Sequence, residues 1–310
     1  MNSVLCVVVT YNRLNMLKVC VERVLSQSMP CDVFIVDNAS TDGTDAWGKE
    51  LSEKLASSKN IKLYYECMKE NLGGAGGFNY GIKKSVQLGY EYVWVMDDDT
   101  AAEADTLEKL MAAAREIKQF GFLSSIVLWK DNSICKMNWQ RKLKLPRNRK
   151  EHHITENDLI PGAIIPIQSA TFVSLVFPTK VIKKVGLPIK EFFIWCDDIE
   201  FTRRIAVKNS IPGYAIVDSH VIHNIANNIG TDIATDDFSR IERYNYAFRN
   251  ENFMYREYGI RGFLYYTAVC LFNTFKILKK SKNYRSKRLY VILKNYFTGL
   301  FFNPVIEEIQ

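Results

Sequence analysis

Three consecutive acids are the sharpest chemical feature of the sequence. Asp97, Asp98 and Asp99 follow directly after the apolar run Y-V-W-V-M, which has the pattern of a buried strand. Ligands of open α/β sheets bind at the carboxyl ends of strands, so these acids lie where a binding site is expected. Adjacent carboxylates repel one another, and a divalent cation relieves that repulsion. The triplet therefore predicts a Mn²⁺ or Mg²⁺ site; the alternative is a helix start with acidic capping residues.

A second pair of acids lies later in the chain. Asp197 and Asp198 follow the aromatic run F-F-I-W at residues 192–195. Aromatic neighbours can desolvate a carboxyl group, raise its affinity for a proton and stack on sugar rings. A carboxylate of this kind can act as a general base that takes the proton of an attacking hydroxyl. Glu200 and Arg203, which follow on a predicted helix, are expected to form ion pairs only.

Glycine is concentrated in one short segment, N-L-G-G-A-G-G-F-N-Y-G. Four glycines fall within five residues: Gly73, Gly74, Gly76 and Gly77. A backbone without Cβ atoms can approach a sugar or a phosphate closely. The segment does not fit the G-x-G-x-x-G dinucleotide pattern, because Asn79 occupies the third glycine position, and the chain has no P-loop.

The elements around these residues alternate between strands and helices. We expect strands at Leu5–Val9, Cys31–Val36, Ile61–Glu66 and Tyr92–Met96, and helices at Leu14–Leu25, Ala46–Leu55 and Gly77–Leu88. Runs that are apolar on both faces are typical of a parallel sheet covered by helices. The first hundred residues therefore predict a nucleotide-binding α/β domain.

Beyond residue 100 the pattern changes. A helix is predicted at Ala104–Phe120, with strands near Phe122–Trp129 and Ile164–Phe177. Between them, Lys130–Lys150 holds eight Lys and Arg residues and one acid, so it is expected to be a mobile basic loop or a hairpin over the site, or else a solvated loop. From Phe238 onward the chain is predicted to be mostly helical.

Six motifs occur in an order that resembles one enzyme family. They are V-V-V-T-Y-N-R (7–13), V-D-N-A-S-T-D-G-T (36–44), N-L-G-G-A-G-G-F-N-Y-G (71–81), D-D-D (97–99), W-C-D-D-I-E-F (195–201) and V-I-H (221–223). Together they resemble the inverting, metal-dependent glycosyltransferases of the GT-A fold, in the large family 2 that includes galactofuranosyl- and rhamnosyltransferases. The resemblance spans about residues 4–224. It implies a GT-A domain over 1–235, with a mostly parallel nucleotide-binding sheet flanked by helices, and a helical, basic, aromatic region over 236–310.

The resemblance also implies roles on the donor side. The residues implied to bind the nucleotide-sugar donor are Thr10, Tyr11, Asn12, Asp37, Asn38, Gly73, Gly74, Gly76, Asp98 and Trp195. Asp97 and Asp99 become the pair that binds Mn²⁺ or Mg²⁺, which bridges the donor diphosphate. His223 is implied to be a third metal ligand or a diphosphate contact, and the alternative is a structural histidine. His220 would share its face if the segment is extended.

On the acceptor side, the resemblance places the catalytic base. Inverting transfer needs a carboxylate that takes the proton of the acceptor hydroxyl as that hydroxyl attacks the anomeric carbon. The family pattern W-D-D-x-E puts this base at Asp198. Asp197 stays the alternative, because Cys196 is inserted between Trp195 and the acid pair.

Charge is distributed unevenly along the chain. The net charge is +7, from 41 Lys and Arg against 34 Asp and Glu, yet residues 258–306 contain nine Lys and Arg and no acid. A near-neutral body with one basic end argues against a nucleic-acid-binding protein and suggests an anionic membrane surface as partner. The stretch Gly262–Phe275 and the basic residues after it predict an interfacial helix, or else a helix packed on the catalytic domain. At about 14 residues, it is too short to span a bilayer.

Cysteine usage and the N-terminal residues indicate the compartment. The seven cysteines form no C-x-x-C pair, so reduced thiols are expected, and M-N-S-V-L-C-V-V-V has no basic region typical of a signal peptide. We expect a cytoplasmic protein, peripheral on the inner face of the cell membrane. The family resemblance implies a lipid-linked or oligosaccharide acceptor and favours UDP-galactofuranose as donor, with dTDP-rhamnose as the alternative.

Two rival classes stay open at this point. A nucleotidyltransferase also combines a nucleotide-binding fold with metal-binding acids, although such enzymes usually carry a Gly-rich basic signature where this chain has T-Y-N-R-L-N. A non-enzymatic module that binds a membrane surface through its basic C-terminal end is the other rival.

Overall fold

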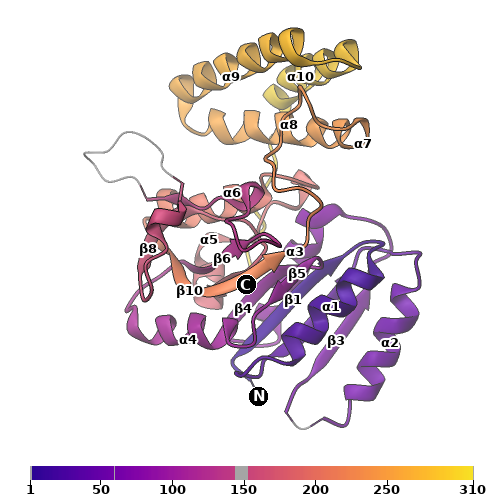
Figure 1. Cartoon of the computed structure of the whole chain (residues 1–310), viewed down its shortest axis with the longest axis vertical. Coiled ribbons are helices and arrows are strands. Elements are labelled where there is room, and N and C mark those ends of the chain that lie inside the picture. Colours follow the sequence, from indigo (N-terminus) through magenta and orange to yellow (C-terminus); the bar gives the residue numbers. More distant parts are fainter. Residues whose placement is uncertain (1, 59, 144–152, 310) are drawn as a thin grey trace. The chain divides into compact units, whose positions relative to one another are not determined.

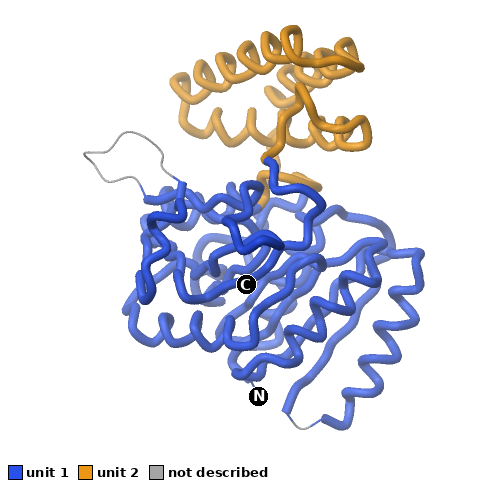
Figure 2. The backbone as a smooth tube through the Cα atoms, in the orientation of Figure 1, with its two compact units in different colours: residues 1–190, 198–229, 306–310 blue, residues 191–197, 230–305 orange. Residues whose placement is uncertain are grey.

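The computed structural model describes residues 2–58, 60–143 and 153–309, and the chain divides into two compact units (Figure 2). Unit 1 comprises Met1–Lys190, Asp198–Ile229 and Ile306–Gln310, and unit 2 comprises Glu191–Asp197 and Gly230–Val305. The division at residue 235 that the sequence suggests stays a prediction. Residues 144–150 of the expected basic loop lie outside the described residues.

Unit 1 is built on one mixed sheet with the order β3-β2-β1-β4-β9-β6-β10-β8-β7, and β5 pairs with β10. The strands are β1 (Val4–Thr10), β2 (Asp32–Asp37), β3 (Leu63–Cys67), β4 (Tyr92–Asp97), β5 (Thr100–Ala102), β6 (Phe122–Leu128), β7 (Arg141–Lys142), β8 (Ile164–Ser169), β9 (Leu175–Pro178) and β10 (Gly213–His223). Strands β3, β2, β1 and β4 are parallel to one another, and β6 is parallel to β10. Strand β9 lies between β4 and β6 and is antiparallel to both. The parallel half confirms the α/β domain predicted from the sequence.

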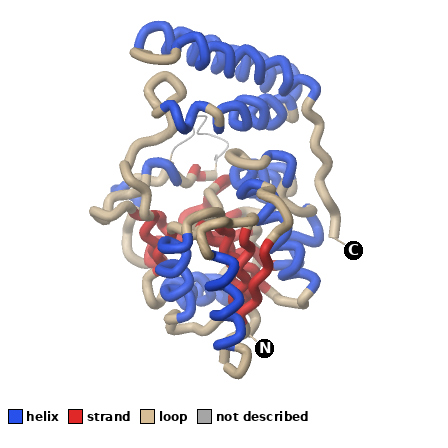
Figure 3. The backbone as a smooth tube through the Cα atoms, turned by 90° about the vertical axis from the view of Figure 1, so that its right-hand side faces the viewer, coloured by secondary structure: helices blue, strands red, loops and turns tan. Residues whose placement is uncertain are grey.

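Helices cover both faces of this sheet (Figures 1 and 3). Those of unit 1 are α1 (Leu14–Leu25), α2 (Thr44–Leu55), α3 (Gly73–Gln87), α4 (Thr106–Glu116), α5 (Thr179–Val185) and α6 (Asp197–Arg203), whose first residue is assigned to unit 2. A π-helical turn, η4 (Arg204–Lys208), continues α6, and short 3₁₀ turns lie at η1 (Lys136–Asn138), η2 (Glu156–Asp158) and η3 (Lys190–Phe192).

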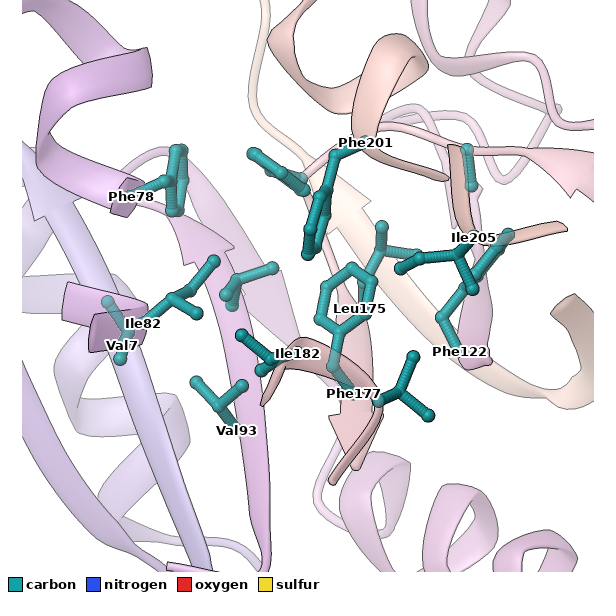
Figure 4. Packing of buried hydrophobic residues seen from close by; sticks show 14 of the residues in the cluster. Val7, Phe78, Ile82, Val93, Phe122, Leu175, Phe177, Ile182, Phe201 and Ile205 are labelled. Atoms are coloured by element: carbon teal, nitrogen blue, oxygen red, sulfur yellow. The ribbon is translucent and has the colours of Figure 1, made fainter. Parts of the chain in front are cut away.

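The core of unit 1 lies in two layers, one on each face of the sheet. Successive residues of β1 alternate between them, so that Val7 belongs to one layer and Val8 to the other. In the first layer, Phe78 and Ile82 of α3 lie beside Val7, as Figure 4 shows. This double burial explains why the strand is apolar at every position.

Three local predictions need correction. The Gly-rich segment was expected to be a turn before a helix that starts at Gly77, but α3 begins at Gly73. The single strand expected near Ile164–Phe177 is two strands, β8 and β9, which β6 and β10 separate in the sheet. The three-residue strand β5 was not predicted, because so short a segment has no readable periodicity.

Unit 2 is helical, as the sequence predicted for the chain after Phe238. It contains α7 (Phe238–Ile241), α8 (Arg243–Arg256), α9 (Gly259–Lys280) and α10 (Arg285–Phe301). Its core includes Tyr266, which is fully buried and donates a hydrogen bond to the carbonyl of Phe248 at 2.6 Å. Among the described residues, no helix has both the length and the apolarity that a bilayer span requires.

Candidate active site

The three acids lie in a tight connection at the carboxyl end of β4. Asp97 is the last residue of that strand, Asp98 and Asp99 form the turn, and β5 starts at Thr100. Strand β5 then runs antiparallel to β10 with Thr100 opposite His223. This pairing brings together a histidine and a carboxylate that are 124 residues apart in the chain.

Asp97, Asp99 and His223 converge on one point. Each offers one potential ligand atom, and these atoms all lie within 4.8 Å of one another. His223 Nε2 is 2.9 Å from Asp99 Oδ1, while its Nδ1 donates to Asn138 Oδ1 at 2.7 Å. Asn138, in η1, thereby orients the imidazole so that Nε2 faces the carboxylates. Two carboxylates and one imidazole fit a divalent cation such as Mn²⁺ or Mg²⁺.

Burial and mutual repulsion give these groups very different proton affinities. Burial, together with the charge of Asp99, raises the pKa of Asp97 to about 8. Although burial opposes ionisation of Asp99, its hydrogen bond to His223 and the charge of Arg13 hold its pKa below the ordinary value. Burial disfavours the charged imidazole, but the hydrogen bond to Asp99 raises the pKa of His223 to about 10. Protons on Asp97 and His223 thus offset the negative charge of the cluster, and a bound cation would take their place.

Arg13 is a member of the site that the sequence analysis did not assign. Its Nη1 lies 2.6 Å from Asp99 Oδ2 and 3.3 Å from Asp98 Oδ1. Thr10 donates from Oγ1 to the other oxygen of Asp98 at 2.7 Å, and burial raises the pKa of Asp98 to about 6. Arg13 is the last residue of the V-V-V-T-Y-N-R motif. Its contacts with Asp98 and Asp99 form because β1 lies next to β4, and the motif alone does not predict that pairing.

The loops after β1 and β2 are joined side by side. Asn12, at φ 54°, accepts the backbone N–H of Thr41 on its Oδ1 at 2.7 Å, and its own N–H donates to Ser40 Oγ at 2.9 Å. Tyr11 between them is exposed. These contacts order the edge of the sheet where a nucleotide base is expected.

Asp37 and Asn38 are buried instead of open to solvent. Asp37 accepts the backbone N–H of Ser40 at 2.9 Å and the hydroxyl of Tyr65 at 2.7 Å, one on each carboxylate oxygen. Asn38 donates from Nδ2 to the carbonyl of Gly73 at 3.0 Å, while its Oδ1 is buried without a hydrogen-bond partner in the described residues. The two side chains therefore position the loop after β2 and the start of α3.

The glycines of α3 have separate roles. A Cβ atom on Gly77 would lie 2.5 Å from Val9 Cγ1, and one on Gly76 would lie 2.5 Å from Leu72 Cβ, so both glycines serve close packing. Gly73 has a left-handed φ of 70° at the helix start. Around Gly74 none of the described residues lies within 4 Å of an added Cβ, so this glycine leaves room for a ligand.

Asp198 lies within electrostatic range of the acid cluster. Its charge contributes to the raised pKa of Asp97, and both residues belong to unit 1. Burial raises the pKa of Asp198 itself to about 6, although its Oδ1 accepts the backbone N–H of Ile199 at 2.7 Å. Asp197 is more deeply buried and is assigned to unit 2. The assignment of Asp198, with Asp197 as the alternative, stays a prediction.

The segment before this acid pair is held in an unusual backbone conformation. Phe193, Trp195 and Cys196 have left-handed φ values of 64°, 66° and 70°. Within unit 2, Trp195 packs edge-on against Tyr244 at 5.1 Å, and the Arg240 guanidinium lies 5.7 Å from its ring centroid. Residues other than glycine that have left-handed φ values cluster at functional sites in proteins. This segment directly precedes the acid pair Asp197 and Asp198, so its conformation agrees with a functional role for the pair.

The expectation that His220 shares the face of His223 is wrong. The two histidines are three residues apart on β10, so their side chains project to opposite sides. His220 Nδ1 lies 3.4 Å from a carboxylate oxygen of Glu103, outside the cluster. His223 is therefore the histidine that faces the acids.

The fold and this acidic cluster define the class of protein as a GT-A-fold glycosyltransferase. The Pyrobaculum calidifontis mannosyltransferase PcManGT, solved with GDP-Man and Mn²⁺, shares the fold at a TM-score of 0.54 and 15% identity, over 96% of this chain and 73% of that one. The chain belongs to glycosyl transferase family 2, whose model matches residues 5–165. This membership confirms the family that the motifs suggested and sets aside both rival classes.

Two relatives extend the match beyond the family domain. Galactofuranosyltransferase GlfT1 of Mycobacterium tuberculosis (strain CDC 1551 / Oshkosh) is 27% identical over 232 residues, which cover 71% of this chain and 70% of that protein. The dTDP-rhamnosyl transferase RfbF of Shigella flexneri is 27% identical over 231 residues, which cover 73% of this chain and 70% of that protein.

Proposed function

We propose that this glycosyltransferase moves galactofuranose from UDP-galactofuranose, with inversion, onto a hydroxyl of a growing lipid-linked cell-surface glycan. The observation that carries the proposal is the convergence of Asp97, Asp99 and His223 at the carboxyl end of β4, with Asp198 within electrostatic range. Similarity to a galactofuranosyltransferase over most of both chains supports the choice of donor.

The residues of the cluster have distinct parts in this chemistry. Asp97, Asp99 and His223 would hold Mn²⁺ or Mg²⁺, and the ion would supply positive charge against the donor diphosphate. Arg13 holds the turn in place through its contacts with Asp98 and Asp99. The open space at Gly74 lets the donor approach the start of α3.

Asp198 takes the proton in the transfer step. The acceptor hydroxyl oxygen forms the new bond to the anomeric carbon, the bond from that carbon to the diphosphate breaks, and the diphosphate leaves with the electron pair. The hydroxyl proton passes to the Asp198 carboxylate. Attack from the side opposite the diphosphate inverts the configuration. A pKa of about 6 leaves Asp198 ionised near neutral pH yet basic enough to accept the proton.

A dTDP-rhamnose donor is the second candidate. It is favoured by the dTDP-rhamnosyl transferase, which matches this chain with the same identity and similar coverage as the galactofuranosyltransferase. Uracil and thymine differ by one methyl group, so the loop that Asp37 and Asn38 position suits either base. A binding measurement therefore has to distinguish between the UDP-linked and the dTDP-linked donor.

We also propose that the enzyme works at the inner face of the cell membrane as a peripheral protein, with no nucleic-acid partner. A lipid-linked acceptor requires access to the bilayer surface. Residues 258–306 contain nine Lys and Arg residues and no acid, so this stretch is suited to bind an anionic surface.

Thermal unfolding with nucleotides tests the proposal. UDP, dTDP and GDP are each added with and without Mn²⁺, and UDP with Mn²⁺ is expected to raise the melting temperature most. A larger shift with dTDP would move the donor to the rhamnose alternative. Absence of any metal-dependent shift with all three nucleotides would contradict the proposed site. Turnover of UDP-galactofuranose, with the anomeric configuration of the product read by NMR, then tests the transfer itself.

A further inference from the structure

The solvent-facing side of α9 is apolar along its whole length. The apolar residues Ile260, Leu264, Leu271, Phe275 and Leu278 are separated by four, seven, four and three residues, so they form one stripe on the helix. Each is between 53% and 70% exposed. A surface helix normally turns such a stripe toward the core, so this helix has a second apolar face that nothing in the described structure covers.

The neighbouring helix α10 repeats the arrangement. Tyr290, Leu293, Phe297 and Phe301 also recur every three to four residues and are 55% to 83% exposed. Four large side chains on one solvent-facing stripe are far more than the single exposed hydrophobic residues found on an ordinary surface.

Both stripes face away from the core that the helices of unit 2 share. Helices α9 and α10 each turn their buried residues toward the core shared with α8, among them Tyr266, Ile277 and Val291. The two helices touch each other through Thr267 Oγ1 and the Tyr296 hydroxyl, 2.9 Å apart. Figure 1 shows α8, α9 and α10 packed together as one group of helices. We call the nine exposed apolar residues of the two stripes the α9–α10 face.

The charged side chains that α9 and α10 themselves contribute have a single sign. Residues 258–306 contain no acid. Three of their cations are engaged within unit 2: Lys276 pairs with Asp232, Lys287 pairs with Glu242, and Arg288 is buried. The other six are exposed: Arg261, Lys279, Lys280, Lys282, Arg285 and Lys294.

We propose that the α9–α10 face inserts into the surface of an anionic bilayer. The apolar residues would sit at the boundary of headgroups and acyl chains, roughly 5–10 Å deep, and the six exposed cations would contact anionic headgroups. Charge decides between a bilayer and a second copy of this chain. A symmetric pair would press one acid-free basic surface onto another, and that arrangement is repulsive. The inference rests on the proposed function in one respect: membrane binding would bring the enzyme to its lipid-linked acceptor.

Vesicle sedimentation with the full chain tests the proposal. The protein should sediment with vesicles of equimolar phosphatidylcholine and phosphatidylglycerol, and much less with phosphatidylcholine alone. The double variant L271E/F275E puts two acids on the face and should weaken this binding by about tenfold or more. The matched control is I160E, because Ile160 is 64% exposed and belongs to unit 1, not to the α9–α10 face, and its replacement should leave binding unchanged.

A second variant tests the charged part. K279Q/K282Q should weaken binding to the anionic vesicles and reduce its dependence on salt, because two headgroup contacts are lost. Equal binding of L271E/F275E and the unchanged protein would overturn the proposal. So would equal binding to both kinds of vesicle. A dimer in solution that L271E/F275E converts to a monomer would assign the face to a second copy instead.

The outcomes separate this inference from the proposed function. The Mn²⁺-dependent stabilisation by UDP is measured on the same preparations. If vesicle binding follows the predictions and the nucleotide effect is absent, the proposed function fails and the surface assignment stands. If the nucleotide effect is present and the vesicles are not bound, only the surface assignment fails.

Discussion

Asp97, Asp99 and Asp198 show how position alone gives one residue type three behaviours. Burial raises the pKa of Asp97 to about 8 and that of Asp198 to about 6, whereas His223 and Arg13 offset burial at Asp99 and keep it ionised. A carboxylate that is ionised at neutral pH but still takes up protons readily suits a general base, and Asp198 has that character. The acid cluster, by contrast, is suited to hold a cation.

The first prediction concerns Asp198. Asp198→Asn keeps the shape of the side chain but removes the proton acceptor, so turnover should fall by roughly 10² to 10⁴ while donor affinity barely changes. In the unchanged enzyme the base must be deprotonated, and its pKa is about 6. Turnover should therefore be constant above that pH and fall by about tenfold per pH unit below it. Steady-state kinetics from pH 5 to about pH 8 measure both effects.

Asp197→Asn is the control for this assignment. If the side chain of Asp197 only orients the acceptor, the variant should lose less turnover and keep the same pH profile. A dead Asp197→Asn enzyme beside an active Asp198→Asn enzyme would move the base by one residue. Circular dichroism must first show that both variants are folded, because Asp197 is buried.

The second prediction concerns the histidines of β10. His223→Ala removes one of the three converging ligand atoms, so the stabilisation by UDP should lose most of its dependence on Mn²⁺. His220→Ala is the matched control, since this histidine faces Glu103 and lies outside the cluster. Calorimetric titration of Mn²⁺ in the presence of UDP measures the difference. Equal losses in the two variants would contradict the metal assignment.

Part of this site could be predicted at the level of residues. The acids and His223 belong to recognisable motifs, and the structure brings them within reach of one another. Asn138, which orients His223, could not be found, because it lies in a 3₁₀ turn without a motif. Arg13 lies inside a motif, but its partner follows β4, and only the adjacency of β1 and β4 makes the contact possible.

At the scale of elements, the start of α3 shows why composition alone misleads. The helix was expected to start only at Gly77, yet the segment is helical from Gly73. Gly77 and Gly81 face the sheet one helical turn apart, and Cβ atoms there would lie 2.5 and 2.3 Å from side-chain atoms of Val9 and Val7. Close helix–sheet packing, which has no local sequence signature, is the reason for these glycines.

The third prediction compares Gly77, which packs against β1, with Gly74, which does not. Gly77→Ala should lower the free energy of unfolding by about 1–3 kcal/mol, because the added methyl group pushes α3 away from β1. Gly74→Ala should be neutral or slightly stabilising, since its Cβ meets nothing within 4 Å and alanine favours a helix. The same variant should weaken binding of the nucleotide sugar if the donor occupies that space. Urea unfolding and calorimetry separate the two effects.

The fourth prediction concerns the segment that precedes the acid pair. Asn250 of α8 is fully buried and donates from Nδ2 to the carbonyls of Phe192 and Trp195 at 3.0 and 2.9 Å. These bonds help to hold the left-handed residues between them. Asn250→Ala leaves buried carbonyls without this donor and should cost about 1–3 kcal/mol in urea unfolding.

Asn273→Ala serves as the comparison for Asn250→Ala. The Asn273 amide donates only to the carbonyl one turn back in α9, so its loss should change stability little. A similar, small effect of both substitutions would show that Asn250 does not hold the segment. The sequence motif R-Y-N-Y-A-F-R-N marked this part of α8, but its contacts needed the structure.

At the scale of the whole molecule, the chain does not divide into two successive pieces. After α10, the residues from Ile306 onward belong to unit 1, where the backbone N–H of Leu187 donates to the carbonyl of Glu307 at 2.8 Å and Lys190 pairs with the Glu307 side chain. No pattern in the sequence predicts that the residues after α10 belong to unit 1. A truncation after Tyr258 would therefore remove part of unit 1 together with α9 and α10 of unit 2, so point variants test the two units more cleanly.

The last prediction is that chemistry and delivery to the membrane can be separated. L271E/F275E alters side chains that are exposed in unit 2, so the variant should keep its melting temperature and its Mn²⁺-dependent stabilisation by UDP. With a short, water-soluble acceptor its turnover should match that of the unchanged enzyme, because that acceptor reaches the site without a bilayer. With a lipid-linked acceptor diluted in anionic vesicles, turnover should fall in proportion to the lost vesicle binding, by about tenfold or more. Raising the density of acceptor in the vesicles should not restore it, since the enzyme itself is absent from the surface. Equal losses with both acceptors would show that α9 supports catalysis directly and would contradict its assignment as a lipid-facing element.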